Sequence, residues 1–342
     1  MGIGKMAKSV RQVVGIINKY RPSFSGITRL SLNENPFPPP ENVVSAIKRE
    51  GESINLYPDP EYTKLKEELA NYLDVKPENI SLGGGASDVL RNICDAFLDP
   101  LDKVVIPLPT YMLYAMLAML REAHIEFLET ESYNVKPEEI EKDAKIVFLC
   151  SPNNPTGNSV PRKVVEEIAD DLRGILVIDE AYAEFSGNNF VDLVETGKII
   201  VVRSFSKFFG LAGARVGYAV GEKNLISALE KVRLPFCISK ASYAAAVEAL
   251  RSLDYYRERA KVIARERDEL QRSLEKYFSV YPSEANFILV RSDVDIARKL
   301  EEKGISVKNV TGLIGLSGIH YRITVGRPED NRKLIQAISE IF

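Results

Sequence analysis

The sequence predicts an α/β fold in which a large domain, with a mostly parallel sheet flanked by helices, is joined to a smaller α+β domain. Two observations predict the large domain. Short apolar runs typical of strands buried on both faces recur through the middle of the chain, and amphipathic helical segments fall between several of them. A third observation predicts the smaller domain, because this alternation stops near Pro235.

Six apolar segments predict the strands of the large domain. They are VVIPL (104–108), HIEFLE (124–129), KIVFLC (145–150), GILVID (174–179), KIIVV (198–202) and RVGYAV (215–220). Between the third and the fourth, PRKVVEEIADDLR places Val164, Val165, Ile168 and Leu172 on one face of a helix. Helices that alternate with buried strands in this way indicate a largely parallel sheet.

The two ends of the chain carry different patterns. NPFPPP (35–40) cannot be helical and is expected to connect an N-terminal arm to the large domain, whereas PEYTKLKEELANYL has one apolar helical face. Beyond Pro235, a long charged helical pattern precedes strand-like NFILV (286–290) and YRITV (321–325) and a closing helix from about Glu329. We therefore expect the arm and part of the small domain in 1–40, the large domain in 41–234 and the small domain in 235–342.

Charge and rare residue types exclude several classes of function. The 342 residues carry 45 basic and 48 acidic side chains, a net charge of −3, so the sequence indicates no nucleic-acid partner. No apolar run is long enough to span a bilayer, so we expect no membrane partner. The three cysteines lie far apart, which predicts reduced thiols in the cytoplasm. With two histidines and no Cys-x-x-Cys pair, we expect no metal site.

The stretch RSFSKFFGLAGAR (203–215) poses the central chemical question. Lys207 could be an exposed charge, the partner of a serine nucleophile or the covalent anchor of a cofactor. Ser204 and Lys207 fit the pattern S-x-x-K, but that interpretation also needs S-D-N and K-T-G, which the sequence lacks. The stretch follows a predicted strand directly, and ligands of open α/β sheets bind at the carboxyl ends of strands, which argues against a simple surface lysine.

Two other predicted strands also run into polar residues. KIVFLC is followed by SPNNPTG, which contains Asn154, and GILVID ends in Asp179, three positions before Tyr182. An aspartate at the end of an apolar strand costs desolvation energy unless a helix cap, an ion pair or a ligand balances it. Because three consecutive parallel strands deliver Asn154, Asp179 and Lys207 to one edge, we expect these residues to lie close together.

A glycine-rich segment supplies a further component. SLGGGASDVLRNICDAF opens a helical pattern with free backbone amides, which can bind an anion, although a turn with a helix cap would look the same. An aldehyde needs a lysine amine and a pyridine nitrogen needs a carboxylate. A phenolic oxygen needs neutral donors, and a phosphate needs amides, hydroxyls and an arginine. Pyridoxal 5'-phosphate would use all of these groups, so we predict it as the cofactor.

At this point a family resemblance can be stated. SPNNPTG, VIDEAY and SFSKFFGLAGAR, in this order and spacing, resemble the fold-type I pyridoxal-phosphate aminotransferases from about residue 20 to the C-terminus. Within that superfamily, LNENPFPPP, NLYPDP, GGGASD, PTYMLY and YRITVGRPEDN make the chain most similar to the histidinol-phosphate aminotransferases. The resemblance implies transamination of histidinol phosphate with 2-oxoglutarate by a cytoplasmic homodimer that serves histidine biosynthesis.

The resemblance also implies a role for each site residue. The catalytic residues are Lys207, which anchors the cofactor and moves the proton, Asp179, which pairs with the ring nitrogen, and Tyr182, which binds the ring oxygen together with Asn154. The other cofactor residues are Gly85, Ala86, Ser87, Ser204, Ser206 and Arg215 around the phosphate, Tyr111 on the ring, and Tyr57, which reaches the neighbouring subunit's phosphate. The substrate residues are Arg322 for the anionic group, Tyr20 from the arm, and Lys308.

Departures from the family pattern leave the substrate open. Ser87 stands where many relatives have aspartate, and Lys308 stands where a second, phosphate-binding arginine is common. Lysine keeps the charge but loses the bidentate fork of arginine. The alternatives are an aromatic amino acid aminotransferase, a threonine-phosphate decarboxylase and, outside enzymes, a regulator that senses pyridoxal phosphate. Such a regulator needs an attached DNA-binding module, and only about 20 residues precede the region of resemblance.

Overall fold

The computed structural model describes residues 11–17 and 28–342. Its α-helices are α1 (Gln12–Ile16), α2 (Glu41–Gly51), α3 (Thr63–Leu73), α4 (Ala86–Phe97), α5 (Leu113–Leu120), α6 (Arg162–Asp171), α7 (Ala183–Ser186), α8 (Lys223–Val232), α9 (Lys240–Leu250), α10 (Leu253–Leu274), α11 (Ala297–Glu302) and α12 (Pro328–Ser339). Its strands are β1 (Thr28–Leu30), β2 (Ile80–Gly83), β3 (Lys103–Leu108), β4 (His124–Glu129), β5 (Ile146–Cys150), β6 (Ile175–Asp179), β7 (Ile199–Ser204), β8 (Gly217–Gly221), β9 (Ser279–Val280), β10 (Phe287–Ser292), β11 (Ile305–Asn309) and β12 (Ile319–Thr324).

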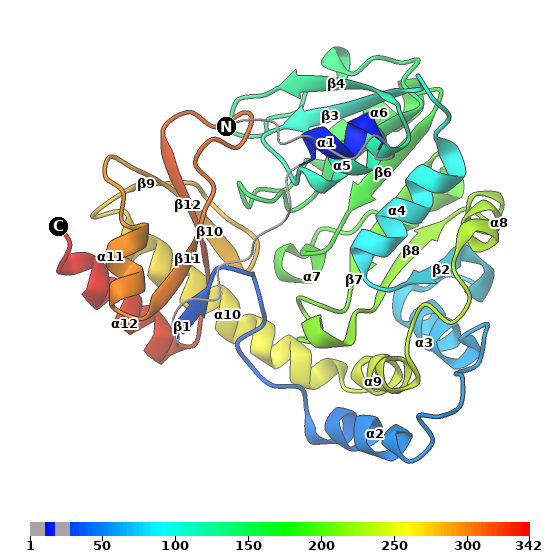
Figure 1. Ribbon diagram of the computed structural model, residues 1–342, viewed down its shortest axis with the longest axis horizontal. Coiled ribbons are helices and arrows are strands. Elements are labelled where there is room, and N and C mark those ends of the chain that lie inside the picture. Colours follow the sequence, from blue (N-terminus) through cyan, green and yellow to red (C-terminus); the bar gives the residue numbers. More distant parts are fainter. Residues whose placement is uncertain (1–10, 18–27) are drawn as a thin grey trace.

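The large domain contains a seven-stranded sheet in the order β2-β8-β7-β6-β5-β3-β4 (Figure 1). Strands β7, β6, β5, β3 and β4 are parallel, and β8 runs antiparallel to both of its neighbours. All six predicted strands are present, each within two residues of the predicted bounds. The predicted α/β class with a mostly parallel sheet is therefore confirmed.

Both faces of this sheet are covered, which explains why its central strands read as continuous apolar runs. In β5, Val147 and Leu149 belong to one hydrophobic cluster, whereas Ile146 and Phe148 belong to the cluster on the opposite face. The first cluster also contains residues of α3, α6 and α9, and the second contains residues of α4, α5 and α8. The sheet is thus the middle of three layers, and its strand ends remain available for a site.

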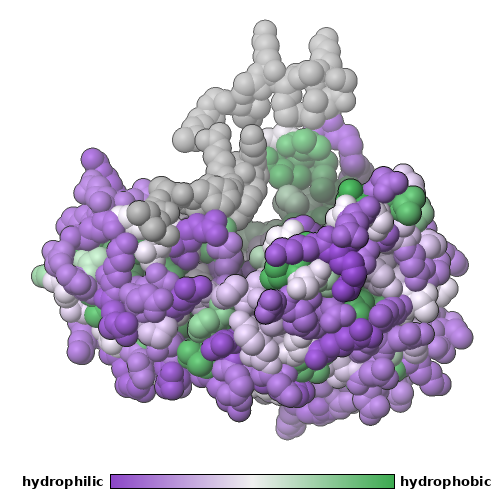
Figure 2. Space-filling view, turned by 90° about the horizontal axis from the view of Figure 1, so that it is seen from below, coloured by the Kyte–Doolittle hydropathy of each residue, from purple (hydrophilic) through white to green (hydrophobic). Residues whose placement is uncertain are grey.

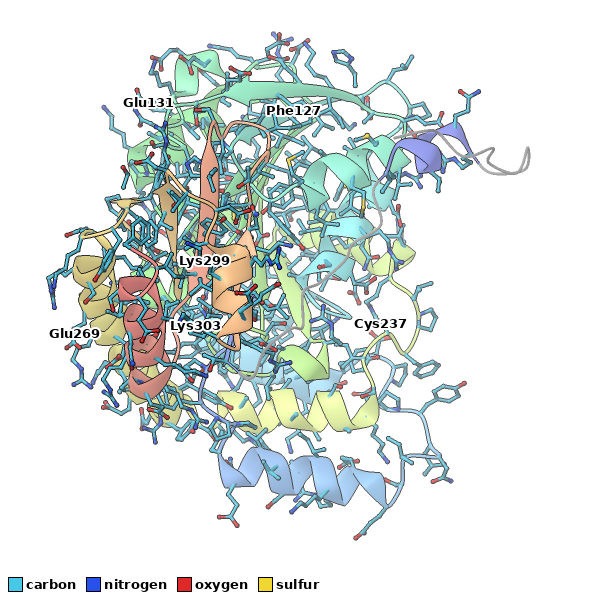
Figure 3. All side chains as sticks on the ribbon, turned by 60° about the vertical axis from the view of Figure 1, so that its left-hand side comes forward. Phe127, Glu131, Cys237, Glu269, Lys299 and Lys303 are labelled. Atoms are coloured by element: carbon cyan, nitrogen blue, oxygen red, sulfur yellow. The ribbon has the colours of Figure 1, made fainter. Side chains whose placement is uncertain are left out.

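The smaller domain holds a five-stranded sheet in the order β1-β11-β12-β10-β9. Its core packs against α12 and the far end of α10, through residues such as Leu334, Leu270 and Leu274. Near its start, α10 contributes Tyr256 to the core of the large domain, so one helix belongs to both cores. Figure 3 shows Glu269 of α10 on the opposite side of the molecule from Cys237 of the large domain.

The packing of α9 bears on the domain boundary. α9 lies against α2 and α3 and places Ala245 and Ala249 in the large core (Figure 1). Residues up to about 250 therefore share that core, although the predicted small domain begins at 235. The boundaries at 40 and 234 stay predictions, and we propose that α10 joins the two domains.

The surface is mainly hydrophilic on the face shown in Figure 2, with hydrophobic patches that are separate from one another. Among the described residues, none of the helices has both the length and the apolar character that a bilayer crossing requires.

Candidate functional site

The site is built where β5, β6 and β7 end side by side. Cys150 and Asp179 are register partners across β5 and β6, and Asp179 pairs with Val202 across β6 and β7. Asn154 and Lys207 follow these strands in the connecting loops. The prediction that the three strand ends would meet at one edge of the sheet is therefore confirmed.

Asp179 is a buried carboxylate that is only 4% exposed. One of its oxygens accepts a hydrogen bond from the Tyr114 hydroxyl at 2.8 Å, and the other accepts one from the Ala181 amide at 3.0 Å. Burial raises the pKa of Asp179, and the two hydrogen bonds oppose that rise. Both donors are neutral, and no ion pair of Asp179 occurs within 11–17 and 28–342, so the site can accommodate a cationic ligand group.

Lys207 is partly buried, and its ammonium group donates a hydrogen bond to the Leu32 carbonyl at 3.0 Å. Its Nζ lies 5.7 Å from the centre of the Tyr182 ring. Burial, and then the positive charge of Arg322, lower the pKa of Lys207 from 10.5 to about 7. The lowered pKa favours the neutral amine, which is the form that attacks an aldehyde.

This shift has a measurable consequence for stability. Over the range between pH about 7 and 10.5 the unfolded chain keeps the Lys207 proton and the folded chain has lost it, so rising pH favours folding. The cofactor-free Lys207→Met variant should therefore be more stable than the cofactor-free wild type at pH 7 and below, and the difference should shrink towards about pH 10. Urea unfolding at a series of pH values measures this difference; a constant value would contradict the depressed pKa.

An anion cradle lies at the N-terminus of α4. Gly85 precedes the helix with a φ of 96°, and the first amides, those of Ala86 and Ser87, lie ahead of the helix's own hydrogen-bond ladder. A Cβ at Gly85 would approach Arg215 Nη2 to 2.5 Å, so only glycine lets the guanidinium lie this close. A Cβ at Gly217 would likewise approach the Ala86 amide nitrogen to 2.3 Å.

Two hydroxyls complete the cradle on the side of β7. Arg215 donates to the Ser206 hydroxyl at 3.3 Å, and the Ser206 amide donates to the Ser204 hydroxyl at 3.0 Å. A helix N-terminus, two hydroxyls and a guanidinium are the groups that bind a phosphate. The structure thus brings together the residues predicted for this purpose.

Arg322 on β12 links the two domains. Its Nη1 donates to the Asn154 side-chain oxygen at 2.7 Å, and its Nη2 donates to the Ser31 carbonyl at 2.8 Å. Lys308 is the cross-strand partner of Arg322 between β11 and β12. Burial, followed by the charge of Arg322, lowers the pKa of Lys308. Two cations side by side indicate a site for a strongly anionic group.

The remaining predicted residues are three tyrosines. Tyr57 is 77% exposed and stacks on Phe236, with ring centroids 4.3 Å apart. Tyr111 is partly exposed and lies edge-on to Tyr114, with centroids 5.8 Å apart. Tyr20 lies outside the described residues.

A short segment of the arm, residues 31–33, also belongs to the site, although none of the three was among the predicted site residues; Leu32 and Asn33 lie in the segment LNENPFPPP. The Ser31 carbonyl accepts from Arg322, the Leu32 carbonyl accepts from Lys207, and the Asn33 side chain donates to the Tyr182 hydroxyl at 3.0 Å. Backbone carbonyls leave no mark in a sequence, so this contact needed the three-dimensional structure. Tyr114 was also missed, although it belongs to the PTYMLY segment that was singled out.

These residues fit pyridoxal phosphate. Asp179 is a buried carboxylate without an ion-pair partner in the described chain, Lys207 has a pKa near neutrality, and glycines keep the α4 cradle open beside Arg215. They suit a pyridine nitrogen, an aldehyde and a phosphate respectively.

Comparisons with known proteins agree with this chemistry. The family model described as aminotransferase class I and II matches residues 25–338. The histidinol-phosphate aminotransferase 2 of Archaeoglobus fulgidus is 47% identical, over 97% of this chain and 100% of that protein. The histidinol-phosphate aminotransferase of Thermoanaerobacter pseudethanolicus is 40% identical, over 92% of this chain and 93% of the relative. The crystal structure of the Sinorhizobium meliloti histidinol-phosphate aminotransferase in complex with pyridoxal-5'-phosphate superposes with a TM-score of 0.88 at 25% identity, covering 99% of this chain and 100% of that one.

Proposed function

Because this chain belongs to the class I and II aminotransferases and is a pyridoxal-phosphate-dependent enzyme, we propose that it transfers the amino group of histidinol phosphate to 2-oxoglutarate. The relatives named above support the donor. The observation that carries the proposal is the pairing of Arg322 with Lys308, which places two cations together across β11 and β12. A phosphate monoester carries up to two negative charges, so this pair suits it better than it suits an uncharged side chain.

In the proposed reaction, the bound cofactor supplies an electron-accepting ring. Lys207 would hold the cofactor through its amine and would act as the base that takes the proton from the donor carbon. A pKa of about 7 suits this task, because the neutral amine is well populated at neutral pH. Asp179 would hold the proton on the ring nitrogen, and Tyr182 and Asn154 would bind the ring oxygen. Arg322 binds the phosphate of the donor and the carboxylate of the acceptor in turn, since its fork fits either anion.

A donor comparison tests the proposed substrate. Initial rates with 2-oxoglutarate as acceptor should be measured for histidinol phosphate, phenylalanine and threonine phosphate, and threonine phosphate should also be assayed for release of carbon dioxide. We expect the largest kcat/KM for histidinol phosphate. A larger value for phenylalanine would favour an aromatic aminotransferase, and release of carbon dioxide would favour the decarboxylase.

Variants of the two cations should separate the substrates further. Arg322→Lys removes the fork and should lower kcat/KM for donor and acceptor alike by about 10- to 100-fold, the effect of losing one charge-assisted hydrogen bond. Lys308→Ala removes only the second charge and should lower kcat/KM for histidinol phosphate roughly tenfold, with a smaller effect on the acceptor. Lys308→Arg is the matched control and should retain activity. Equal losses with donor and acceptor in Lys308→Ala would contradict a phosphate-specific role.

We also propose a homodimer in which Tyr57 reaches the cofactor phosphate of the partner. Ile54, Leu56, Tyr57 and Leu234 are each more than half exposed, and Tyr57 stacks on Phe236 beside them. Such an apolar group is larger than the isolated exposed side chains of an ordinary surface and favours an interface. The three cysteines are unpaired, which supports a cytoplasmic location.

The dimer proposal predicts the behaviour of two variants. Leu56→Glu should shift the protein to a monomer in sedimentation experiments, because the new charge would be buried at the interface. Leu101→Glu changes a still more exposed leucine outside this group and should leave the mass unchanged. If Tyr57 also binds the partner's cofactor, the monomeric variant should bind pyridoxal phosphate at least tenfold more weakly. A dimer that persists in Leu56→Glu would contradict this interface.

A further inference from the structure

Asn33 forms a hydrogen bond with each of its polar groups. It is fully buried at 0% exposure and adopts a left-handed conformation with φ of 54°, which asparagine tolerates better than most residues. Its amide N–H donates to the Thr324 hydroxyl oxygen at 2.9 Å, and its carbonyl accepts from the Asn286 side chain at 3.1 Å. Its side-chain oxygen accepts from the Thr324 hydroxyl at 3.2 Å, and its side-chain nitrogen donates to the Tyr182 hydroxyl oxygen at 3.0 Å.

The structure assigns a direction to these bonds. The Thr324 oxygen accepts from the Asn33 backbone N–H, which can only donate, and the Thr324 hydroxyl donates to the Asn33 side-chain oxygen. This orients the amide, and its NH2 group therefore faces Tyr182. The Tyr182 oxygen accepts that hydrogen bond, so its own proton points away from Asn33.

The direction matters because of where Tyr182 lies. Its ring lies 5.7 Å from Lys207 Nζ, and it is buried between the strand end of β6 and Phe287 of the small domain. The neighbouring arm residues Ser31 and Leu32 contact Arg322 and Lys207 through their carbonyls. Segment 31–33 therefore reaches the anion-binding arginine, the lysine and the tyrosine at once.

We propose that Asn33 is a positioning residue that turns the Tyr182 O–H towards the ring oxygen of pyridoxal phosphate, under the control of Thr324 on the small domain. This inference rests on the proposed function, in which Tyr182 binds that oxygen. A hydrogen bond donated to the ring oxygen favours its ionised form. Lys207 would be joined to the cofactor through its side-chain nitrogen, which lies next to the ring oxygen. Without the hydrogen bond from Tyr182, the ring oxygen would hold the proton on that nitrogen more strongly.

The isosteric variant Asn33→Asp tests the direction of the network. Its carboxylate can only accept, so the Tyr182 proton should turn towards residue 33 and away from the cofactor. We expect the pH midpoint of the bound cofactor's visible absorbance, which follows the proton on the joining nitrogen, to rise by roughly one unit, the effect of losing one hydrogen bond to an ionised group. Tyr182→Phe should raise it in the same way. Equilibrium dialysis should show weaker cofactor binding in both variants.

Asn286→Asp is the matched control. It also buries a carboxylate beside Asn33, but its described hydrogen bond goes to the Asn33 backbone carbonyl and not to the Tyr182 hydroxyl, so the midpoint should stay close to that of the wild type. In the double variant Asn33→Asp/Tyr182→Phe, the midpoint should equal that of Tyr182→Phe alone. An equal shift in Asn33→Asp and Asn286→Asp, or additive shifts in the double variant, would show a merely structural role and overturn the proposal.

Two further results complete the test. If Tyr182→Phe itself leaves the midpoint unchanged, the proposed contact of Tyr182 with the cofactor is wrong. This result would contradict the proposed function, whereas an unchanged midpoint in Asn33→Asp alone would contradict only the role of Asn33. If Asn33→Asp does not fold, Thr324→Val replaces it in the test. Without the Thr324 hydroxyl, the side-chain amide of Asn33 can rotate so that its oxygen faces Tyr182. An unchanged midpoint in Thr324→Val would then overturn the control by Thr324.

Discussion

Replacement of Lys207 by alanine should lower transamination by about 10⁴-fold or more, since the variant loses both the covalent anchor and the base. The physical reason is the environment of the amine. Burial and the charge of Arg322 lower its pKa to about 7, and no other lysine of the described chain is placed against Tyr182 in this way. The purified variant should also lack the yellow, borohydride-reducible adduct of the wild type, which absorbance and mass spectrometry detect.

Lys198→Ala is the control for this change. Lys198 is also a partly buried lysine that donates to backbone carbonyls, those of Ala169 and Asp170, but it lies away from the site. Its loss should leave turnover and the adduct intact. A Lys207→Ala protein that still transaminates and forms the adduct would refute the assignment of Lys207 as the anchor.

Asp179→Asn should reduce kcat by about 10²- to 10³-fold, the usual cost of removing one preorganised electrostatic contact. The same change should stabilise the cofactor-free protein at neutral pH. Burial raises the folded-state pKa of Asp179, so the wild type loses stability as pH rises above the unfolded-state value, and asparagine does not titrate. Steady-state kinetics and urea unfolding of the cofactor-free protein measure the two effects.

Glu180→Gln is the control for Asp179→Asn, and we expect it to lower stability. Glu180 is the next residue and is equally buried, but Arg203 Nη2 lies 2.6 Å from its carboxylate. Removing Glu180 leaves the buried Arg203 with only the more distant carboxylate of Glu184, at 3.9 Å, so this variant should be destabilised by about 3 kcal/mol. If Asp179→Asn were destabilised in the same way, the Asp179 carboxylate would stabilise the folded protein. The assignment of Asp179 as a cofactor-binding residue would then be contradicted.

The large domain could be predicted closely because its strands are buried on both faces. Continuous apolar runs mark such strands in any sequence, and glycine or proline bounds many of them. The strand ends then placed Asn154, Asp179 and Lys207 together by topology alone. β2 was missed because SLGG was interpreted only as part of the anion loop, although Ile80–Gly83 pairs with β8.

Other parts of the site could not be predicted, because they depend on contacts between distant segments. β1 is three residues long and pairs with β11, more than 270 positions away, so no local sequence pattern predicts it. Tyr114 lies within the apolar helix α5 and resembles an ordinary core residue, yet its hydroxyl reaches Asp179. The lowered pKa of Lys308 likewise depends on the approach of two strands.

Helix α10 gives the molecule a mechanical property. Its 22 residues form a rod about 33 Å long, anchored by Tyr256 in one core and by Leu274 in the other. A rotation of about 5° at the Tyr256 end would swing the opposite end by roughly 3 Å. Because β12 packs in the same core as Leu274, a change in the angle between α10 and the large domain would move the sheet that carries Arg322.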